Sequence, residues 1–500
     1  MIETYIYNSK NTFIEAQKRA PLFEALRDYI KRDMVAYHTP GHKQGKGVDK
    51  EMLELLGENV FKIDLTEIPE VDNLHDPDGV IKEAQELTAL LYGSDKSFFL
   101  VNGSTTGNNV MIMTVCDPGD KIIIPRNIHK SVLGGIILSG AIPIYVPALW
   151  DNDLGIYHGI DIDKLEEALI NNPDAKGVLL VNPTYYGISL DLKKVIDLIH
   201  KYNRPALIDE AHGPHFHFHE DLPISALKAG ADMVVQSTHK ILSSMTQSSI
   251  LHLKEGRVNT KRAKNILQLI QSTSPSYVLM ASLDVARRQM ALHGRELLER
   301  TLQLAEDARK RLNKINGIYC FGKEICGSYG VFDIDITKLV INVSKLGISG
   351  FHALDILDRK YNIQSEMATL YNVLELVTIG NDKEDLDRLV NAIECISKDE
   401  TLEKDLRVNS KAPPVPSIPK STMSPREAFF STTEKVPFYS SIGRICAEII
   451  SPYPPGIPIL APGEIINEEI VDYLQLIYEH GAFINGPEDI RLQTIKVVRE

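Results

Sequence analysis

Short apolar runs alternate with stretches of helical periodicity through the middle of the chain. Runs of this length, rich in β-branched residues and bounded by turn residues, predict buried strands. Helical stretches such as residues 191–202 separate the runs, and this alternation predicts a mostly parallel sheet covered by helices on both faces. The runs are SFFLV (97–101), KIIIP (121–125), AIPIYV (141–146), GVLLV (177–181), PALID (205–209) and MVVQ (233–236).

The patterns on either side of this sheet predict further domains. Residues 1–60 are mainly helical in periodicity, interrupted where Pro40 and the nearby glycines force a loop in HTPGHKQG. Helical sequence continues from 255 to 313, with a break before a long helix that starts near Tyr277. We therefore expect an N-terminal helical segment (1–60) whose loop is either an active-site loop or an ordinary interdomain turn. It is followed by a large domain (61–315), a small α/β domain (316–400), a proline-rich linker (401–425) and a C-terminal α+β domain (426–500).

Composition and charge narrow the class of protein. The chain has 500 residues, of which 43% are hydrophobic and 24% charged, and these are ordinary values for a globular protein of several domains. A formal net charge of -13, without clustered basic residues, argues against a nucleic-acid-binding surface. We therefore expect no nucleic-acid partner.

Targeting and membrane signals are weak. Residues 131–150 carry no charge, but Pro143 and several glycines favour a helix followed by a short strand over a membrane span. The N-terminus shows no secretory signal, and the five cysteines have no metal-ligand spacing. We expect a cytoplasmic protein with reduced thiols and no membrane association.

Lys240 lies at the centre of ADMVVQSTHKILSSMTQSSILH (231–252), where an apolar strand gives way to a polar turn. A lysine amine at the end of a buried strand can be partly desolvated and can form a Schiff base with a carbonyl group. A solvated turn lysine fits the same pattern, so this stretch alone leaves both interpretations open.

Other polar groups follow strands of the predicted sheet, whose carboxyl ends bind ligands in such folds. Ser104 and Thr105 offer hydroxyls at a helix start that suits a phosphate, although helix capping explains them equally well. His129 either stacks on a flat ring or caps its helix. Asp209 ends an apolar strand, where a carboxylate needs a cationic or hydrogen-bonding partner. Together with Lys240, these groups form the set that holds pyridoxal 5'-phosphate.

Four histidines follow Asp209, in the sequence AHGPHFHFH. Alternate histidines share one face of an extended segment, which suggests zinc, but no cysteine or second ligand pair completes a site. We therefore predict no metal and expect His212 to face the cofactor.

The motifs, taken in chain order, resemble the Orn/Lys/Arg decarboxylase family. The resemblance spans about residue 35 to the C-terminus and is closest to the short bacterial form assigned as arginine decarboxylase, which lacks an N-terminal wing domain. It implies an aspartate-aminotransferase-like α/β fold in which residues 61–315 bind pyridoxal phosphate. The motifs are HTPGHKQG from His38, NGSTTGN from Asn102, PRNIHKS from Pro125, DEAHGPHFHFH from Asp209, STHK around Lys240, STSPSYVLMASLD from Ser272 and YPPGIPILAPGE from Tyr453.

The resemblance also implies roles for individual residues. Lys240 would be the Schiff-base lysine, Asp209 the partner of the pyridine nitrogen and His129 the ring-stacking group. His212 stands where longer members often have tryptophan, and His212, Lys240 or a water would return a proton to the substrate Cα. The remaining implied residues are Ser104, Thr105, Ser237, His239 and Thr273 near the cofactor phosphate, and Glu464 and His42 at the substrate.

The activity implied by the resemblance is decarboxylation of a basic amino acid. The expected reaction converts L-arginine to agmatine and carbon dioxide in polyamine biosynthesis, with lysine or ornithine as the alternative substrate, giving cadaverine or putrescine. Another reaction on the same fold, such as transamination, and a catalytically silent binding protein are further alternatives. We expect a homodimer or higher homo-oligomer, because relatives with this fold build their sites across a dimer interface.

Overall fold

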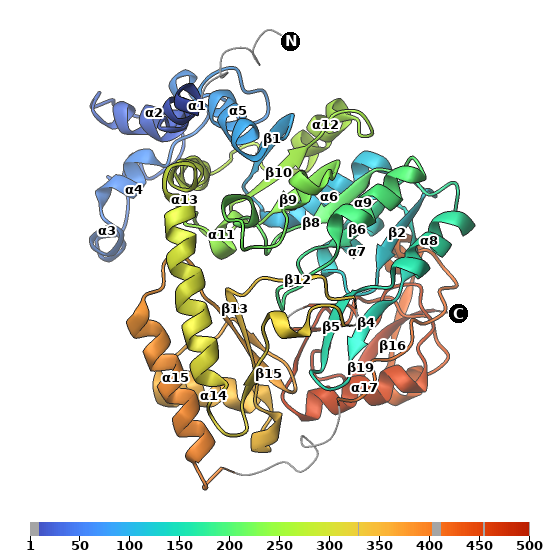
Figure 1. Cartoon of the computed structure of the whole chain (residues 1–500). Helices are drawn as coiled ribbons and strands as arrows, with labels where there is room; N and C mark the ends of the chain where they lie inside the picture. Colours follow the sequence, from blue (N-terminus) through green and yellow to red (C-terminus); the bar gives the residue numbers. More distant parts are fainter. Residues whose placement is uncertain (1–9, 329, 403–411, 454–455, 500) are drawn as a thin grey trace. The chain divides into compact units, whose positions relative to one another are not determined.

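A seven-stranded sheet, in the order β1-β10-β9-β8-β6-β2-β3, organises the middle of the chain. The computed structural model describes residues 10–328, 330–402, 412–453 and 456–499 (Figure 1). β2 runs parallel to both β3 and β6, whereas β10 runs antiparallel to β1 and β9. Each of the six runs predicted as strands forms one, as β1 (Lys96–Leu100), β2 (Lys121–Pro125), β3 (Ile142–Val146), β6 (Val178–Val181), β8 (Ala206–Asp209) and β9 (Met233–Gln236), and β10 (Ser249–Leu253) completes the sheet.

The chain divides into two compact units, each assembled from separated segments. Unit 1 comprises Met1–Thr114, Asp209–Glu220 and Ile224–Leu298. Unit 2 comprises Val115–Ile208, Asp221–Pro223 and Glu299–Glu500. Helix α13 (Tyr277–Leu312), 36 residues long and yellow in Figure 1, runs from the first unit into the second.

Unit 1 contains the helical N-terminal segment and three strands of the sheet. Its first helices confirm the predicted helical pattern, and the HTPGHKQG motif lies between α2 and α3 as a non-helical segment. Besides β1, β9 and β10, the unit contains α1 (Lys10–Gln17), α2 (Pro21–Ile30), α3 (Lys50–Leu56), α4 (Glu58–Ile63), α5 (Val80–Tyr92), α6 (Gly103–Val115, whose last residue belongs to unit 2), α10 (Ala226–Ala229), α11 (Thr238–Ile241) and α12 (Thr260–Ile270).

Unit 2 contains the parallel strands and all the structure after α13. Its helices are α7 (Lys130–Ser139), α8 (Ile162–Asn171), α9 (Leu192–Lys201), α14 (Gly350–Tyr361), α15 (Lys383–Lys398), α16 (Pro425–Phe430) and α17 (Glu468–Glu479). Its further strands are β4 (Ala148–Asp151), β5 (Ile156–Ile160), β7 (Ile188–Ser189), β11 (Tyr319–Cys320), β12 (Asp333–Ile334), β13 (Lys338–Asn342), β14 (Met367–Ala368), β15 (Asn372–Leu376), β16 (Thr433–Pro437), β17 (Ser451–Tyr453), β18 (Phe483–Asn485) and β19 (Thr494–Val498).

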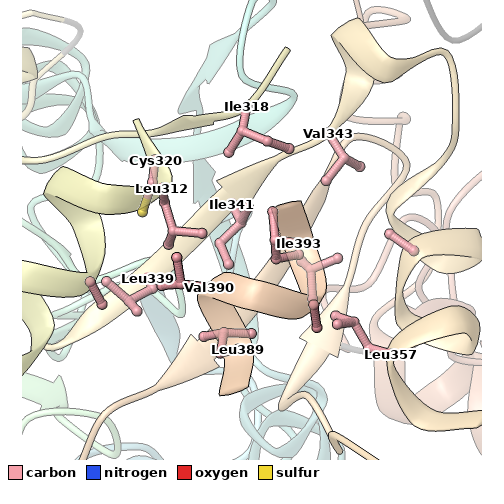
Figure 2. Packing of buried hydrophobic residues seen from close by; sticks show 14 of the residues in the cluster. Leu312, Ile318, Cys320, Leu339, Ile341, Val343, Leu357, Leu389, Val390 and Ile393 are labelled. Atoms are coloured by element: carbon pink, nitrogen blue, oxygen red, sulfur yellow. The ribbon is translucent and has the colours of Figure 1, made fainter. Parts of the chain in front are cut away.

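Two hydrophobic cores of unit 2 lie mainly in the regions predicted as the small and C-terminal domains, and the first of them also includes the end of α13, which was predicted as part of the large domain. The first packs the end of α13 against β13, α14 and α15 (Figure 2). In it, Ile341 on β13 and Ile393 on α15 are completely buried. The second core lies among residues 438–497 and includes Ile470 and Leu474 of α17. The boundaries of the domains stay predictions, and residues 403–411 of the predicted linker lie outside the described part of the chain.

Several local details differ from the sequence-based expectation. The apolar residues near 375–379 also predict a strand, and the strand that forms there, β15, starts earlier because its residues pair in register with β13, from Lys338↔Leu376 to Asn342↔Asn372. The apolar run IPIL (457–460), which has the pattern of a short strand, forms only an isolated bridge between Leu460 and Ile450. The polar turn expected at Lys240 is the short helix α11. No helix in the described part of the chain combines the length and apolarity needed to cross a membrane.

Candidate active site

Lys240 lies in contact with a histidine. Helix α11, which carries Lys240, follows β9 with only Ser237 between them. The Lys240 Nζ lies 2.8 Å from the Nε2 of His212, which is buried. A charged Lys240 donates to this nitrogen, and the ring proton of a neutral His212 then lies on Nδ1. An amine and a group that can accept its proton therefore lie side by side.

The carboxylate of Asp209, the last residue of β8, is buried and held at both oxygens. Oδ2 accepts a hydrogen bond from the Asn108 Nδ2 at 2.8 Å, and Oδ1 accepts one from the Ala211 backbone N–H at 3.1 Å. Burial raises the pKa of the Asp209 carboxyl, while the Asn108 hydrogen bond and the charge of Lys240 oppose that rise. A carboxylate in this setting is suited to a cationic partner.

Serine hydroxyls gather at the start of α6. The Ser104 Oγ lies 2.7 Å from the Ser237 Oγ and 3.3 Å from the Ser249 Oγ. Gly103, with φ of +71°, makes the turn from β1 into α6, a backbone conformation that favours glycine. Hydroxyls beside the N-terminus of a helix suit a phosphate. The structure thus brings together the predicted residues Lys240, His212, Asp209, Ser104 and Ser237.

Three other predicted residues of unit 1 lie in different settings. Thr105 and Thr273 are exposed. His239 is half-buried, and its Nδ1 donates to the Ser248 carbonyl oxygen at 2.7 Å. Burial lowers the pKa of His239, so its ring is neutral near pH 7 and its Nε2 is an acceptor. The roles of these residues at the phosphate stay predictions.

His42, predicted to contact the substrate, is held by its own loop and by the end of α4. Its Nδ1 accepts the Gly45 N–H at 3.3 Å, so the ring proton lies on Nε2, which is 3.1 Å from the Asp64 Oδ2. The ring also packs edge-on against Phe61, with centroids 5.6 Å apart. These contacts fix the orientation of His42, and its substrate role stays a prediction.

His129 belongs to unit 2, where it is the N-cap residue of α7. Its Nδ1 accepts the Ser131 N–H at 3.2 Å and lies 2.8 Å from the Ser131 Oγ. The capping interpretation weighed for this residue is thus present in the structure. Ring stacking by its imidazole stays a prediction.

Glu464, predicted to contact the distal end of the substrate, forms a buried ion pair. Its Oε1 and Oε2 accept Nη1 and Nη2 of Arg126 at 2.6 and 2.9 Å, and its Oε2 also accepts the Ala461 N–H at 2.8 Å. The Arg126 guanidinium, in turn, stacks on the Tyr145 ring with its Cζ 4.8 Å from the centroid. Both carboxylate oxygens are therefore occupied within unit 2, and a role at the substrate stays a prediction.

We expect Glu464→Ala to destabilise the protein by about 3–5 kcal/mol, because it leaves the buried Arg126 charge unpaired. Thermal unfolding measures this effect, and Arg126→Met/Glu464→Leu is the matched control because it removes both charges and should recover much of the loss. An unchanged melting temperature together with a raised KM would contradict the structural role and favour the predicted substrate contact.

Comparison with known proteins places the chain in a family. The family model described as "Orn/Lys/Arg decarboxylase, major domain" matches residues 20–385, and that for "Orn/Lys/Arg decarboxylase, C-terminal domain" matches residues 411–488. The chain belongs to the Orn/Lys/Arg decarboxylase family.

Individual members of this family are similar over nearly the whole chain. The arginine decarboxylase of Bacillus subtilis (strain 168) is 47% identical over 485 residues, which cover 97% of this chain and 99% of that protein. The arginine decarboxylase of Bacillus anthracis is 46% identical over 487 residues, covering 97% and 98%. The crystal structure of the Francisella novicida lysine decarboxylase LdcF has a TM-score of 0.83 at 25% identity, covering 98% of this chain and 82% of that one. These findings confirm the resemblance and the predicted fold class.

Two of the histidines that follow Asp209 in this family member, His215 and His217, pack against aromatic rings. His217 packs against the rings of Tyr92 and Phe218, and burial lowers its pKa to about 4. His215 is completely buried beside Phe216. Within the described residues, no three histidine, cysteine or acidic side chains are grouped so that they could hold a metal ion.

A buried polar chain lies behind the site. The Ser97 Oγ lies 2.8 Å from the His252 Nδ1, and the His252 Nε2 lies 3.2 Å from the Gln236 Oε1. The Gln236 Nε2 donates to the Glu210 Oε2 at 2.7 Å, and the Glu210 Oε1 accepts the Ala226 N–H at 2.6 Å. These hydrogen bonds connect Glu210, which follows Asp209, to Gln236, which precedes Ser237. They therefore link the ends of β8 and β9 beside the site.

Glu210 should make stability depend on pH. Burial raises the pKa of this carboxyl from 4.5 to about 8, so the folded protein keeps it protonated while the unfolded chain ionises it. Its stabilising contribution is therefore full below pH 4.5 and is lost as the pH rises towards 8. The loss is at most about 5 kcal/mol by linkage.

Melting temperatures of the cofactor-free protein and of Glu210→Gln, taken between pH 5 and pH 8, test this expectation. Wild type should lose stability relative to the variant as the pH rises. Parallel curves would show that Glu210 does not titrate in this range.

Proposed function

We propose that this protein is a pyridoxal-phosphate-dependent arginine decarboxylase, which converts L-arginine to agmatine and carbon dioxide. The observation that supports it most strongly is the contact between Lys240 and His212 beside a buried Asp209, in a member of this decarboxylase family. The near full-length identity of 47% to a protein named arginine decarboxylase supports the choice of substrate.

The residues present in unit 1 fit the proposed cofactor. Ser104, Ser237 and the start of α6 supply hydroxyls and a helix N-terminus that suit its phosphate. The Thr238 Oγ1, in the same turn as Lys240, is buried and has no hydrogen-bond partner among the described residues, so it can take part in binding. Asp209 is suited to the ring nitrogen and Lys240 to covalent attachment.

In the proposed reaction, the cofactor, Asp209, and the pair of Lys240 and His212 have separate roles. When bound, pyridoxal phosphate supplies the electron sink that takes up the electron pair left behind by carbon dioxide. Asp209 holds a proton at the ring nitrogen, which favours that uptake of charge. Lys240 and His212, 2.8 Å apart, can exchange a proton and deliver it to the substrate Cα.

The remaining roles rest on the family motifs. In this proposal His129 stacks on the ring, and Thr105, His239 and Thr273 contribute to the phosphate site. Glu464 and His42 bind the substrate. The protein would act in the cytoplasm as a homodimer or higher homo-oligomer in polyamine biosynthesis. Sedimentation of the cofactor-loaded protein tests its oligomeric state.

Lysine is the second candidate substrate, because a solved structure that shares the fold over 98% of this chain is a lysine decarboxylase. The assay that separates the candidates compares L-arginine, L-lysine and L-ornithine with added pyridoxal phosphate, and quantifies carbon dioxide and the amine product. We expect agmatine from arginine at the highest kcat/KM. Cadaverine or putrescine as the main product would keep the reaction and change the substrate, whereas a keto acid without carbon dioxide would overturn the proposal.

A further inference from the structure

Asn108 lies on α6, the helix whose N-terminus forms part of the proposed phosphate site, and it contacts Asp209. Its Nδ2 donates to the Asp209 Oδ2 at 2.8 Å, and both side chains are almost completely buried, with exposed fractions of 1% and 4%. A hydrogen bond to a charged group in a buried setting is stronger than one between neutral groups. The amide thus fixes one carboxylate oxygen in place.

The same helix face carries both ends of the site. Ser104 and Asn108 are four residues apart on α6, and residues at this spacing lie on one face of a helix. Ser104 contacts Ser237 and Ser249 on the phosphate side, while Asn108 contacts Asp209. The position of α6 therefore sets the distance between the hydroxyl cluster and the carboxylate.

Close packing fixes the position of α6. A Cβ atom added at Gly107 would lie 2.3 Å from the Val235 Cγ2 and 3.1 Å from the Leu100 Cδ1, so any larger residue would force these side chains to shift. Val235, in turn, accepts the Glu210 N–H at 2.9 Å through its carbonyl oxygen. The helix that carries Asn108 thus packs directly on the strand next to Asp209.

We infer that Asn108 is a positioning residue of the site, whose amide N–H holds the Asp209 carboxylate in place for the ring nitrogen of the cofactor. The inference rests on the proposed function. An amide suits this task because it donates a hydrogen bond without adding charge, whereas a carboxylate at this position would repel Asp209 unless the pair shared a proton.

The pH dependence of pyridoxal phosphate binding by two variants of Asn108 distinguishes a hydrogen-bonding role of this residue from a purely steric one. Asn108→Ala removes the donor at every pH, so its dissociation constant for pyridoxal phosphate should rise about 10- to 100-fold throughout. Asn108→Asp carries a donor only while the two carboxyls share a proton. Its affinity should therefore approach the wild-type value at acidic pH and fall as the pH rises.

The experiment measures pyridoxal phosphate binding by visible absorbance, from pH 5 to pH 9, for wild type and both variants. Thr114→Val is the matched control, since it removes a buried hydroxyl of the same helix that donates to the Val110 carbonyl at 2.6 Å. The visible spectrum should also change at a higher pH on acidification in Asn108→Ala than in wild type. The reason is that Asp209 loses a hydrogen bond that favours its charged form.

The outcomes separate this inference from the proposed function. Wild-type affinity in Asn108→Ala, or an affinity of Asn108→Asp that does not vary with pH, would overturn the role of Asn108 alone. If wild type itself develops no visible absorbance with pyridoxal phosphate, the proposed function fails. Circular dichroism of the cofactor-free variants checks folding, and if Asn108→Ala does not fold, the pH dependence of Asn108→Asp decides the outcome.

Discussion

Replacing Lys240 with alanine should abolish turnover and the visible absorbance that pyridoxal phosphate acquires on this protein. The substitution removes the amine that would attach to the cofactor and also the proton partner of His212, 2.8 Å away. The loss of a nucleophile that doubles as an acid–base group should lower kcat by about 10⁴-fold or more. Steady-state carbon dioxide release and an absorbance scan of the loaded protein measure the two effects.

A second lysine of unit 1 provides the control for this experiment. Lys228 is exposed and its Nζ donates to the His217 carbonyl at 2.9 Å, so Lys228→Ala should leave both turnover and absorbance unchanged. Residual decarboxylation by Lys240→Ala within tenfold of wild type would mean that the amine at this position does not perform the chemistry.

Replacing Asp209 with asparagine should lower kcat by about 10²–10³-fold, because a preorganised charge is lost while the shape of the side chain is kept. Asp209→Ala should cost more, since it also removes the oxygens that accept Asn108 and Ala211. The Asp209→Asn variant should still fold, because burial disfavours the charged carboxyl and the neutral amide carries no such cost. Single-turnover kinetics and thermal unfolding separate the two consequences.

Asp161→Asn serves as the comparison, since Asp161 caps α8 by accepting the Asp163 and Lys164 N–H groups and has no predicted role in the reaction. Its kcat should match that of wild type. Near-normal turnover in Asp209→Asn would contradict the proposed role of Asp209 at the ring nitrogen.

The central sheet and the order of the site motifs were predictable from the sequence because both depend on local pattern. The apolar runs that predict strands, such as 121–125 and 233–236, are short and bounded by turn residues, and the structure reproduces them. Ligands of such sheets bind at the carboxyl ends of the strands, and Ser104, Asp209 and Lys240 lie at the carboxyl ends of three of them. Their proximity in unit 1 follows from topology rather than from any single motif.

The partners of these residues were not predictable, because partners far apart in sequence leave no local signal. Arg126 follows β2 and stands in the PRNIHKS motif, but nothing near it indicates a pairing with Glu464, 338 residues away. Asn108 lies inside NGSTTGN, where its neighbours suggested only a phosphate site, and its contact with Asp209 spans 101 residues. Helical spacing from Ser104 was the one available clue that Asn108 shares its face.

The most direct test of the site is to locate the covalent attachment of the cofactor. Wild-type protein loaded with pyridoxal phosphate is reduced with borohydride, digested and analysed by mass spectrometry. The account predicts one phosphopyridoxyl group per chain, on Lys240, and none in Lys240→Ala. Stoichiometric modification of a different lysine in wild type, or no modification of protein that decarboxylates its substrate, would contradict it.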